Sequence, residues 1–257
     1  MSEIHPTAIV DSRAQLDSGV VVGPYCVIEP EVVVGDGTVI GPHVHLARGT
    51  RIGRKCRIFT GATLGSIPQD LKFEQEESLL VIGDRTTIRE YATLNRGTKE
   101  SGKTVVGSDC LLMAYSHVAH DCVIGDHCIL ANAVNLAGHV VIENWASIGG
   151  MVPVHQFVRI GQHAFVGGGY RVPKDVPPYI LAVSEPLQYG GLNSVGLKRR
   201  GFSDESLRQL KRAFRILYKS NLNVSQAVTE LQALPAKSPE VQNLLAFIEG
   251  SSRGIIG

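Results

Sequence analysis

An aliphatic residue recurs at every sixth position over the first two thirds of the chain. Stepping by six from Ile4 to Val172 passes 29 positions, and 26 of them are Ile, Leu or Val. This period fits neither a helix nor a simple alternating strand, so it predicts a short strand plus a corner with one inward aliphatic residue per side. Coils in register would pair their strands with the coils above and below, which is a parallel β-helix.

The three exceptions to the repeat are acidic and fall in two polar stretches. They are Asp70, Glu76 and Glu100. A charged side chain cannot take the inward position of a dry coil, so we expect loops at about 66–80 and 97–104.

The repeat resembles that of the hexapeptide-repeat acyltransferases. Glycine often follows the aliphatic residue, as in "VGPYCV" and "IGDHCI", where it eases a tight corner. The resemblance implies a left-handed triangular β-helix and a homotrimer, neither of which periodicity alone gives.

The pattern changes after residue 172. Four prolines make the stretch 173–186 a crossover that breaks any strand ladder. We expect helices at about 203–220, 224–234 and 239–249, the first beginning at a serine cap with two acids in its first turn. The predicted fold class is therefore all-β plus α, with a β-helix domain over 1–190 and a helical cap over 191–257.

Composition restricts the partners and the compartment. The 25 basic and 24 acidic residues nearly cancel, so no overall field recruits nucleic acid or a membrane surface. The N-terminus lacks a signal-peptide pattern, and no apolar run approaches the roughly 18 residues of a transmembrane segment. An odd number of cysteines, five, favours a reducing compartment, and we expect a cytoplasmic protein.

The cysteines share one position in the repeat, four residues after an aliphatic residue, where other coils often carry alanine. They are Cys26, Cys56, Cys110, Cys122 and Cys128. Small inward-facing thiols are typical of this position, so Cys122 is interpreted as structural although it follows "SHVAHD".

Four histidines stand out because they lie in nearby coils: His117, His120, His139 and His155. Residues about 18 positions apart lie above one another, since a β-helix advances roughly 4.8 Å per coil. His120 and His139 are 19 apart and His139 and His155 are 16 apart, so they are candidates for one groove. The alternative, that they only cap corners by hydrogen bonding, stays open on the residues alone.

Zinc is disfavoured by the spacing. Some hexapeptide-repeat proteins resembling γ-class carbonic anhydrases bind zinc through three histidines, two of them five residues apart. Here the close pair, His117 and His120, is three apart, so we predict no metal site.

Several longer motifs resemble one family, the UDP-N-acetylglucosamine acyltransferases that begin lipid A biosynthesis. They are "PQDLKF", "IREYATLNRGT", "LLMAYSHVAHDCVIGDHCILANAVNLAGHV", "IGGMVPVHQF", "KDVPPY" and "GLKRRGFS". Together they span nearly the whole chain. The resemblance implies transfer of a 3-hydroxyacyl chain from acyl-carrier protein to the 3-position of UDP-N-acetylglucosamine.

The same resemblance assigns the chemistry. His120 would be the general base for the sugar hydroxyl, and the backbone N–H of Gly138 would donate to the oxyanion. Asp121 could orient His120, although adjacent strand residues tend to point to opposite faces. A thioester is already activated, so no cofactor or metal is implied.

The substrate contacts implied by the resemblance extend over the chain. Asp70 and Lys72 would reach the active cleft, with Asp70 holding sugar or acyl hydroxyls. His117 and His139 would contact the sugar. The nucleotide would be bound by His155, Gln156, Asn193, Arg199 and Arg200. Gly168 would set the acyl-chain length, with the ring of Tyr170 as a second candidate.

Two residues depart from the pattern of many family members. Val195 stands where an acid is common, and Asn95 where histidine is common. A basic cluster, Arg48, Arg51, Arg54, Lys55 and Arg57, is either a docking patch for an acidic carrier protein or a solvated face.

Two alternatives remain at this point. One is another hexapeptide-repeat acyltransferase, either dependent on acetyl-CoA or acting on a sugar amine later in the same pathway. The other is a β-helix scaffold without catalytic activity.

Overall fold

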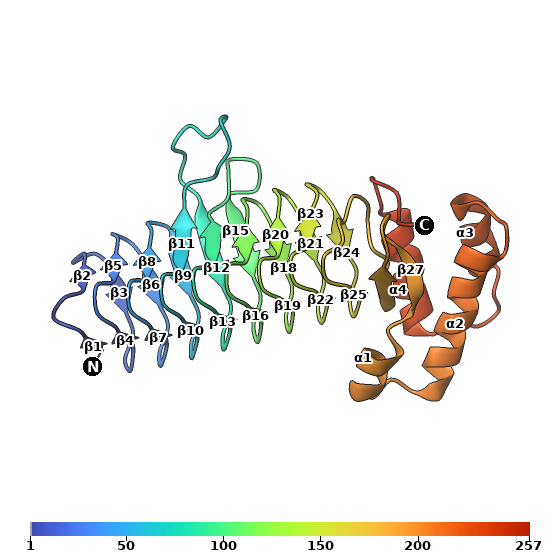
Figure 1. Cartoon of the computed structure of the whole chain (residues 1–257), viewed down its shortest axis with the longest axis horizontal. Helices are drawn as coiled ribbons and strands as arrows, with labels where there is room; N and C mark the ends of the chain where they lie inside the picture. Colours follow the sequence, from blue (N-terminus) through green and yellow to red (C-terminus); the bar gives the residue numbers. More distant parts are fainter. Residues whose placement is uncertain (1) are drawn as a thin grey trace.

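The computed structural model describes residues 2–257, which form a long parallel β-helix followed by a group of helices (Figure 1). Successive coils add one strand to each of three sheets in turn. Leu112 aligns with Leu130 and Ile124 with Ile142, each one coil further on. This is the register that the period of six predicts.

The strands are short, and their order in each sheet follows the coil. The first sheet contains β1 (Glu3–Ile4), β4 (Val21–Val22), β7 (Val39–Ile40), β10 (Arg57–Ile58), β13 (Thr87–Ile88), β16 (Leu111–Leu112), β19 (Ile129–Leu130), β22 (Ser147–Ile148), β25 (Phe165–Val166), β26 (Ile180–Val183) and β27 (Gln188–Leu192). The second contains β2 (Ile9–Val10), β5 (Val27–Ile28), β8 (His45–Leu46), β11 (Thr63–Ser66), β14 (Thr93–Asn95), β17 (His117–Val118), β20 (Asn135–Leu136) and β23 (Pro153–Val154). The third contains β3 (Gln15–Leu16), β6 (Val33–Val34), β9 (Thr50–Ile52), β12 (Leu79–Ile82), β15 (Lys103–Val106), β18 (Val123–Ile124), β21 (Val141–Ile142) and β24 (Arg159–Ile160).

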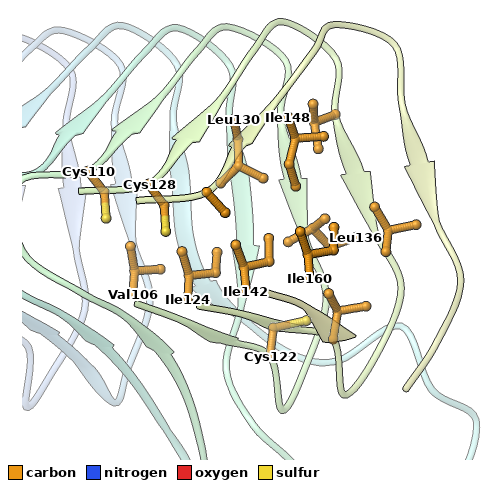
Figure 2. Close-up of a cluster of buried hydrophobic side chains, with 14 of the residues drawn as sticks. Val106, Cys110, Cys122, Ile124, Cys128, Leu130, Leu136, Ile142, Ile148 and Ile160 are labelled. Carbon is orange, nitrogen blue, oxygen red and sulfur yellow. The ribbon is translucent and has the colours of Figure 1, made fainter. Parts of the chain in front are cut away.

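The repeat aliphatic residues fill the inside of the coil. Figure 2 shows Val106, Ile124 and Ile142 in one row, with Leu130 and Ile148 from another sheet facing the same interior. All five side chains are at most 2% exposed. The aliphatic columns predicted by the sequence are therefore confirmed.

The cysteines occupy the same interior and carry no disulfide. All five are buried and free. Cys122 Sγ lies 3.2 Å from the carbonyl oxygen of Ala137 in the next coil, and burial raises the pKa of this thiol to about 12. A buried thiol that holds its proton so firmly is a poor nucleophile, which agrees with the structural role predicted for Cys122.

Two loops leave the coil where the repeat is interrupted. The first excursion, residues 67–78, joins β11 to β12, and the second excursion, residues 96–102, joins β14 to β15. Both project from the same side of the β-helix (Figure 1). The two predicted loops are confirmed.

The Pro-rich stretch 173–186 differs from the prediction. It contains β26, which pairs in parallel with β25, and β26 then pairs antiparallel with β27. The ladder survives because three of the prolines precede β26 and Pro186 follows it, so Ile180–Val183 keeps all its N–H groups.

Four helices close the end of the β-helix: α1 (Ser194–Arg199), α2 (Asp204–Lys219), α3 (Val224–Gln232) and α4 (Pro239–Glu249). The predicted helices are confirmed, with Ser203 capping α2, while α1 was not expected and α3 ends two residues earlier than predicted. The division of the chain into domains near residue 190 stays a prediction. Within residues 2–257 no helix has the length and apolar character needed to cross a bilayer.

The inward and outward positions of the coil predict different mutational costs. Val34 in β6 is fully buried, whereas Val39 in β7 is 45% exposed. We expect Val34→Ala to lower the free energy of unfolding by about 2 kcal/mol, because two methyl groups leave a cavity. Val39→Ala should change it by less than about 0.5 kcal/mol. Equal losses for the two variants in chemical denaturation would contradict the assignment of the two faces.

Candidate active site

The candidate site lies on one corner of the coil, where the chain turns from the second sheet into the third. His120 and Asp121 form this corner after β17, and Gly138 and His139 form it one coil later, after β20. The ring centroids of His120 and His139 are 5.3 Å apart in an edge-on arrangement. The structure therefore brings these two predicted histidines together.

His120 is oriented by the acid that follows it. Its Nδ1 lies 2.7 Å from Asp121 Oδ2, and the Asp121 side chain is fully buried. The concern that neighbouring residues point to opposite faces does not apply, because both residues belong to a turn and Asp121 has a φ of 60°.

Asp121 is ionised despite its burial. Burial alone would raise its pKa, but hydrogen bonds from Ser101, His120 and Thr98 outweigh that effect and lower the pKa to about 2. An ionised carboxylate only accepts hydrogen bonds, so the ring proton of His120 is on Nδ1. The lone pair of Nε2 is left available, as a general base requires.

Gly138 packs against the reactive edge of that ring. A Cβ at this position would lie 2.7 Å from His120 Cε1 and 2.9 Å from Nε2. Only glycine fits there without moving the imidazole. Among residues 2–257 the Gly138 N–H has no backbone acceptor, since the first residue of the corner does not join the ladder.

Two further histidines have different environments. His117 lies on β17, where Nδ1 is 2.8 Å from Thr93 Oγ1 of the coil before, and burial lowers its pKa. His139 presents Nε2 to two carboxylates, at 3.3 Å from Glu100 Oε2 and 3.7 Å from Asp121 Oδ2.

The expected histidine column ends at His139. The ring that stacks on His139 is Phe157, at 4.5 Å between centroids, because it is Phe157 that lies 18 residues further on. His155 and Gln156 are exposed, and His155 lines a separate cavity of about 310 Å³ with Arg171 and Glu185.

The first excursion reaches the surroundings of this corner. Asp70 and Lys72 line a cavity of about 290 Å³ together with Thr98, Lys99 and Glu100 of the second excursion. Glu100 also contacts His139, so the cavity that Asp70 and Lys72 line is next to the His120 corner.

Asn95 has a structural position below the first excursion. It is 3% exposed, and its Nδ2 donates to the carbonyl oxygen of Ile67 at 3.0 Å. Asn95, which replaces the histidine common in the family, thus anchors the first residue of the first excursion.

The predicted nucleotide residues of the cap gather in another cavity, of about 650 Å³. Asn193, Val195, Arg199 and Arg200 line it, opposite the outward side chains of the first sheet. Asn193 caps α1 by accepting from the Gly196 N–H and also donates to the His163 carbonyl at 3.0 Å.

Arg200 is held by an aromatic column at a second corner. Its guanidinium lies 5.0 Å above the Trp145 ring, and its Nη1 is 3.5 Å from His163 Nδ1. His163 lies at a corner of the coil but is only 9% exposed, and burial with the nearby Arg200 lowers its pKa to about 4. Trp145 stacks on it from one coil earlier, 18 residues before, but Tyr179 and Phe202 lie beyond the repeat, which is why the period gave no sign of this burial.

A single protomer therefore separates the predicted site into two parts. The His120 corner joins the second and third sheets, whereas the cap cavity lies over the first sheet. In a triangular coil a corner is opposite to the third side, so the base and the arginines face away from each other.

Gly168 is close to the backbone of the preceding coil. A Cβ there would lie 3.1 Å from the carbonyl oxygen of Gly150, a tight contact. A Cβ at Gly167 would lie 3.0 Å from Tyr170 Cε2, so the tyrosine ring covers the neighbouring glycine.

The basic cluster at residues 48–57 is not one patch. Arg51 lies on the third sheet and Arg57 on the first, with Arg54 and Lys55 at the corner between them. Arg48 is paired with Glu31 at 2.9 Å. The sequence wraps these charges around the coil, which favours the solvated face of the two interpretations, and a docking role for any of them stays a prediction.

Three possible metal ligands meet at the corner. One atom each from His120, Asp121 and His139 lies within 4.8 Å of the others. However, the Asp121 carboxylate already accepts bonds from the His120 ring and two hydroxyls, and a cation would displace the Nδ1 proton. The donor set fits a hydrogen-bonded acid–imidazole pair better than a metal site.

Sequence reasoning missed the residues that surround Asp121. Thr98, Ser101 and Thr104 all contact it, and Glu100 contacts His139. The one available signal was the break in the repeat at Glu100, which marks the loop but not its partners.

Comparison with known proteins agrees with this arrangement. A family model described as "Udp N-acetylglucosamine O-acyltransferase; Domain 2" matches residues 175–256, and one described as "Bacterial transferase hexapeptide (six repeats)" matches residues 103–138. The acyl-(acyl-carrier-protein)–UDP-N-acetylglucosamine O-acyltransferase of Paracidovorax citrulli is 54% identical over 260 residues, covering 99% of each chain. That of Janthinobacterium sp. (strain Marseille) is 50% identical over 261 residues, covering both chains in full.

The chain belongs to the UDP-N-acetylglucosamine O-acyltransferase family. The solved UDP-N-acetylglucosamine acyltransferase of Bacteroides fragilis superposes with a TM-score of 0.97 at 45% identity, covering 99% of this chain and 100% of that one. The predicted left-handed parallel β-helix with C-terminal helices is confirmed, and these relatives carry the name of the UDP-N-acetylglucosamine acyltransferases and not that of either alternative.

The contact between Gly138 and His120 predicts a sharp steric effect in this member of the UDP-N-acetylglucosamine O-acyltransferase family. We expect Gly138→Ala to lower turnover at least tenfold, because the new methyl group displaces the His120 ring. Gly150→Ala is the matched control, since Gly150 is also the first residue of a corner and an added Cβ meets no side chain, only the backbone of Asn132, with its O at 3.2 Å and its N at 4.0 Å. Similar turnover in the two variants would show that the position of the ring does not matter.

Proposed function

We propose that this chain transfers a 3-hydroxyacyl group from acyl-carrier protein to the 3-hydroxyl of UDP-N-acetylglucosamine, the first step of lipid A biosynthesis. The observation that carries the proposal is the oriented imidazole of His120, with Nδ1 hydrogen-bonded to a buried carboxylate and Nε2 without a hydrogen-bond partner among residues 2–257. Membership of the family supports the donor and the acceptor named for the relatives.

In the reaction His120 acts as the general base. Nε2 takes the proton of the sugar hydroxyl as its oxygen attacks the thioester carbonyl carbon, and Asp121 stabilises the resulting imidazolium. The Gly138 N–H donates to the oxyanion of the tetrahedral intermediate. When the C–S bond breaks, the imidazolium returns its proton to the departing thiolate of the carrier. A thioester needs no further activation, so the transfer uses no cofactor or metal.

The substrates bind to residues around both parts of the site. Asp70, Lys72, His117 and His139 bind the sugar and the acyl hydroxyl. The nucleotide is bound by His155, Gln156, Asn193, Arg199 and Arg200, with the two arginines on the diphosphate.

The active unit is a homotrimer. His120 and the cap arginines lie on opposite sides of one β-helix, so a site that uses both needs residues from two copies of the chain. The near-neutral charge and the five free thiols favour a cytoplasmic location, where carrier protein and nucleotide sugar are available.

The proposal predicts a specific loss in the His120→Ala variant. Its turnover with UDP-N-acetylglucosamine and a hydroxyacyl-carrier protein should fall by a factor on the order of 100 or more, the usual value of a general base. His43→Ala is the control, because His43 stacks on Tyr25 in the early coils. Near-normal turnover of His120→Ala would remove this residue from the mechanism, and transfer from acetyl-CoA alone would overturn the proposed donor.

The glycines at 167–169 predict a long acyl chain. No side chain projects from Gly168, so we expect a preference for donors of about fourteen carbons or more, each buried methylene contributing roughly 0.8 kcal/mol.

Gly168→Met should shift this preference toward shorter donors without changing the KM for the nucleotide sugar. Gly168→Ala is its control, since it makes the same contact with Gly150 but leaves the groove open. A wild-type preference for ten carbons, or an unchanged preference in Gly168→Met, would move the length limit elsewhere, with Tyr170 the first candidate.

A further inference from the structure

The second excursion, residues 96–102, folds over the carboxylate of Asp121. The Thr98 N–H donates to Oδ1 at 3.0 Å and the Thr98 hydroxyl donates to Oδ2 at 2.8 Å. The Ser101 hydroxyl forms a very short contact with Oδ1. Three of the four hydrogen bonds to this carboxylate therefore come from one loop, and the fourth comes from His120.

These bonds fix both the position and the charge of the carboxylate. With Oδ1 held by two donors and Oδ2 by the Thr98 hydroxyl, the carboxyl plane cannot rotate, and the remaining bond of Oδ2 is directed at His120 Nδ1. The same donors offset the desolvation of a buried anion, in keeping with the low pKa of Asp121.

The Ser101 hydroxyl lies within hydrogen-bond distance of two acceptors but can donate its single proton to only one of them. Besides Asp121 Oδ1, the carbonyl oxygen of Lys103 lies within reach, 2.9 Å from Ser101 Oγ. The ionised carboxylate is the stronger acceptor, so the proton goes to Asp121.

The second excursion is itself held in place by the first. The Lys99 N–H donates to Glu76 Oε1 at 3.0 Å, and Lys99 Nζ lies 3.5 Å from Glu74 Oε2. Within the second excursion, the Gly102 N–H donates to the Thr98 carbonyl oxygen at 2.8 Å. Thr98 and Ser101, which supply the three loop donors to Asp121, therefore lie on a loop that other hydrogen bonds hold in place.

We propose that Thr98 and Ser101 are positioning residues for the transfer reaction, acting through Asp121 to keep the His120 ring in its productive orientation and tautomer. They touch neither substrate in this scheme. The inference rests on the proposed role of His120 as the base, and it deepens that role by assigning the second excursion a function.

The test compares variants that remove one hydroxyl at a time. Ser101→Ala removes a donor to Oδ1, and Thr98→Val removes the donor to Oδ2 while keeping the branched shape and the backbone N–H. Each should lower kcat roughly tenfold, the factor that corresponds to one hydrogen bond to a charged group, with the KM of both substrates unchanged. Ser101→Thr and Thr98→Ser keep a hydroxyl and should recover most of the rate.

Ser18→Ala is the matched control. Ser18 Oγ donates to Asp36 Oδ1 at 2.8 Å, a serine–aspartate bond of the same kind on an exposed corner far from His120. It should leave kcat unchanged. Thermal unfolding of each variant verifies that the β-helix is intact, and the Thr98→Val result still tests the proposal if Ser101→Ala fails to fold.

The outcomes separate this inference from the proposed function. A wild-type protein without transferase activity would refute the proposed function itself, and an active His120→Ala variant would remove His120 from the mechanism. An active wild type with an inactive His120→Ala variant, but with Ser101→Ala and Thr98→Val at the wild-type kcat, would overturn the positioning role alone. So would a loss confined to KM, or a loss in the hydroxyl-bearing variants as large as in Ala and Val.

Discussion

The structure depends on one packing constraint, that a single aliphatic residue from each side of the coil must point inward. Because the interior is dry and narrow, every sixth residue is fixed as Ile, Leu or Val, and each side of the triangle can hold only a short strand (Figure 2). The corners follow from this spacing. Their side chains are outside the coil by construction, and corresponding corners of successive coils lie above one another. The coil thereby produces a rigid column of exposed positions, and the packing of the interior does not specify which side chains they carry.

The candidate active site is built on that column. His120 and His139 occupy successive copies of one corner, and Gly138, which directly precedes His139, is the residue that lets the Cε1–Nε2 edge of the His120 imidazole approach the backbone. The coil alone cannot bury Asp121, because corner side chains face solvent. The second excursion supplies the missing cover, and with it the hydroxyl and N–H donors that a buried carboxylate needs. The break in the repeat is thus what converts a structural corner into a candidate catalytic one.

Much of this could be predicted from the sequence because the repeat is local and strict. The coil, its inward thiols, both excursions and the helices at 204–219 and 239–249 followed from period, charge and capping residues. What could not be predicted depends on contacts between segments that the period does not relate. Ser101 meets Asp121 through a loop of irregular path, and His163 is buried by Tyr179 and Phe202 from beyond the repeat. The stacking of Phe157 on His139 was available from the 18-residue register but was obscured by the nearby His155.

The central claim is that ionised Asp121 holds the His120 proton on Nδ1 and leaves Nε2 free as the base. Nitrogen-15 NMR of the histidine side chains at about pH 9, where an ordinary imidazole is neutral, measures this tautomer directly. We predict that the His120 signals report protonated Nδ1 and unprotonated Nε2, and that Asp121→Asn shifts them toward the other tautomer. A wild-type His120 protonated on Nε2, or a tautomer that Asp121→Asn leaves unchanged, would contradict the account.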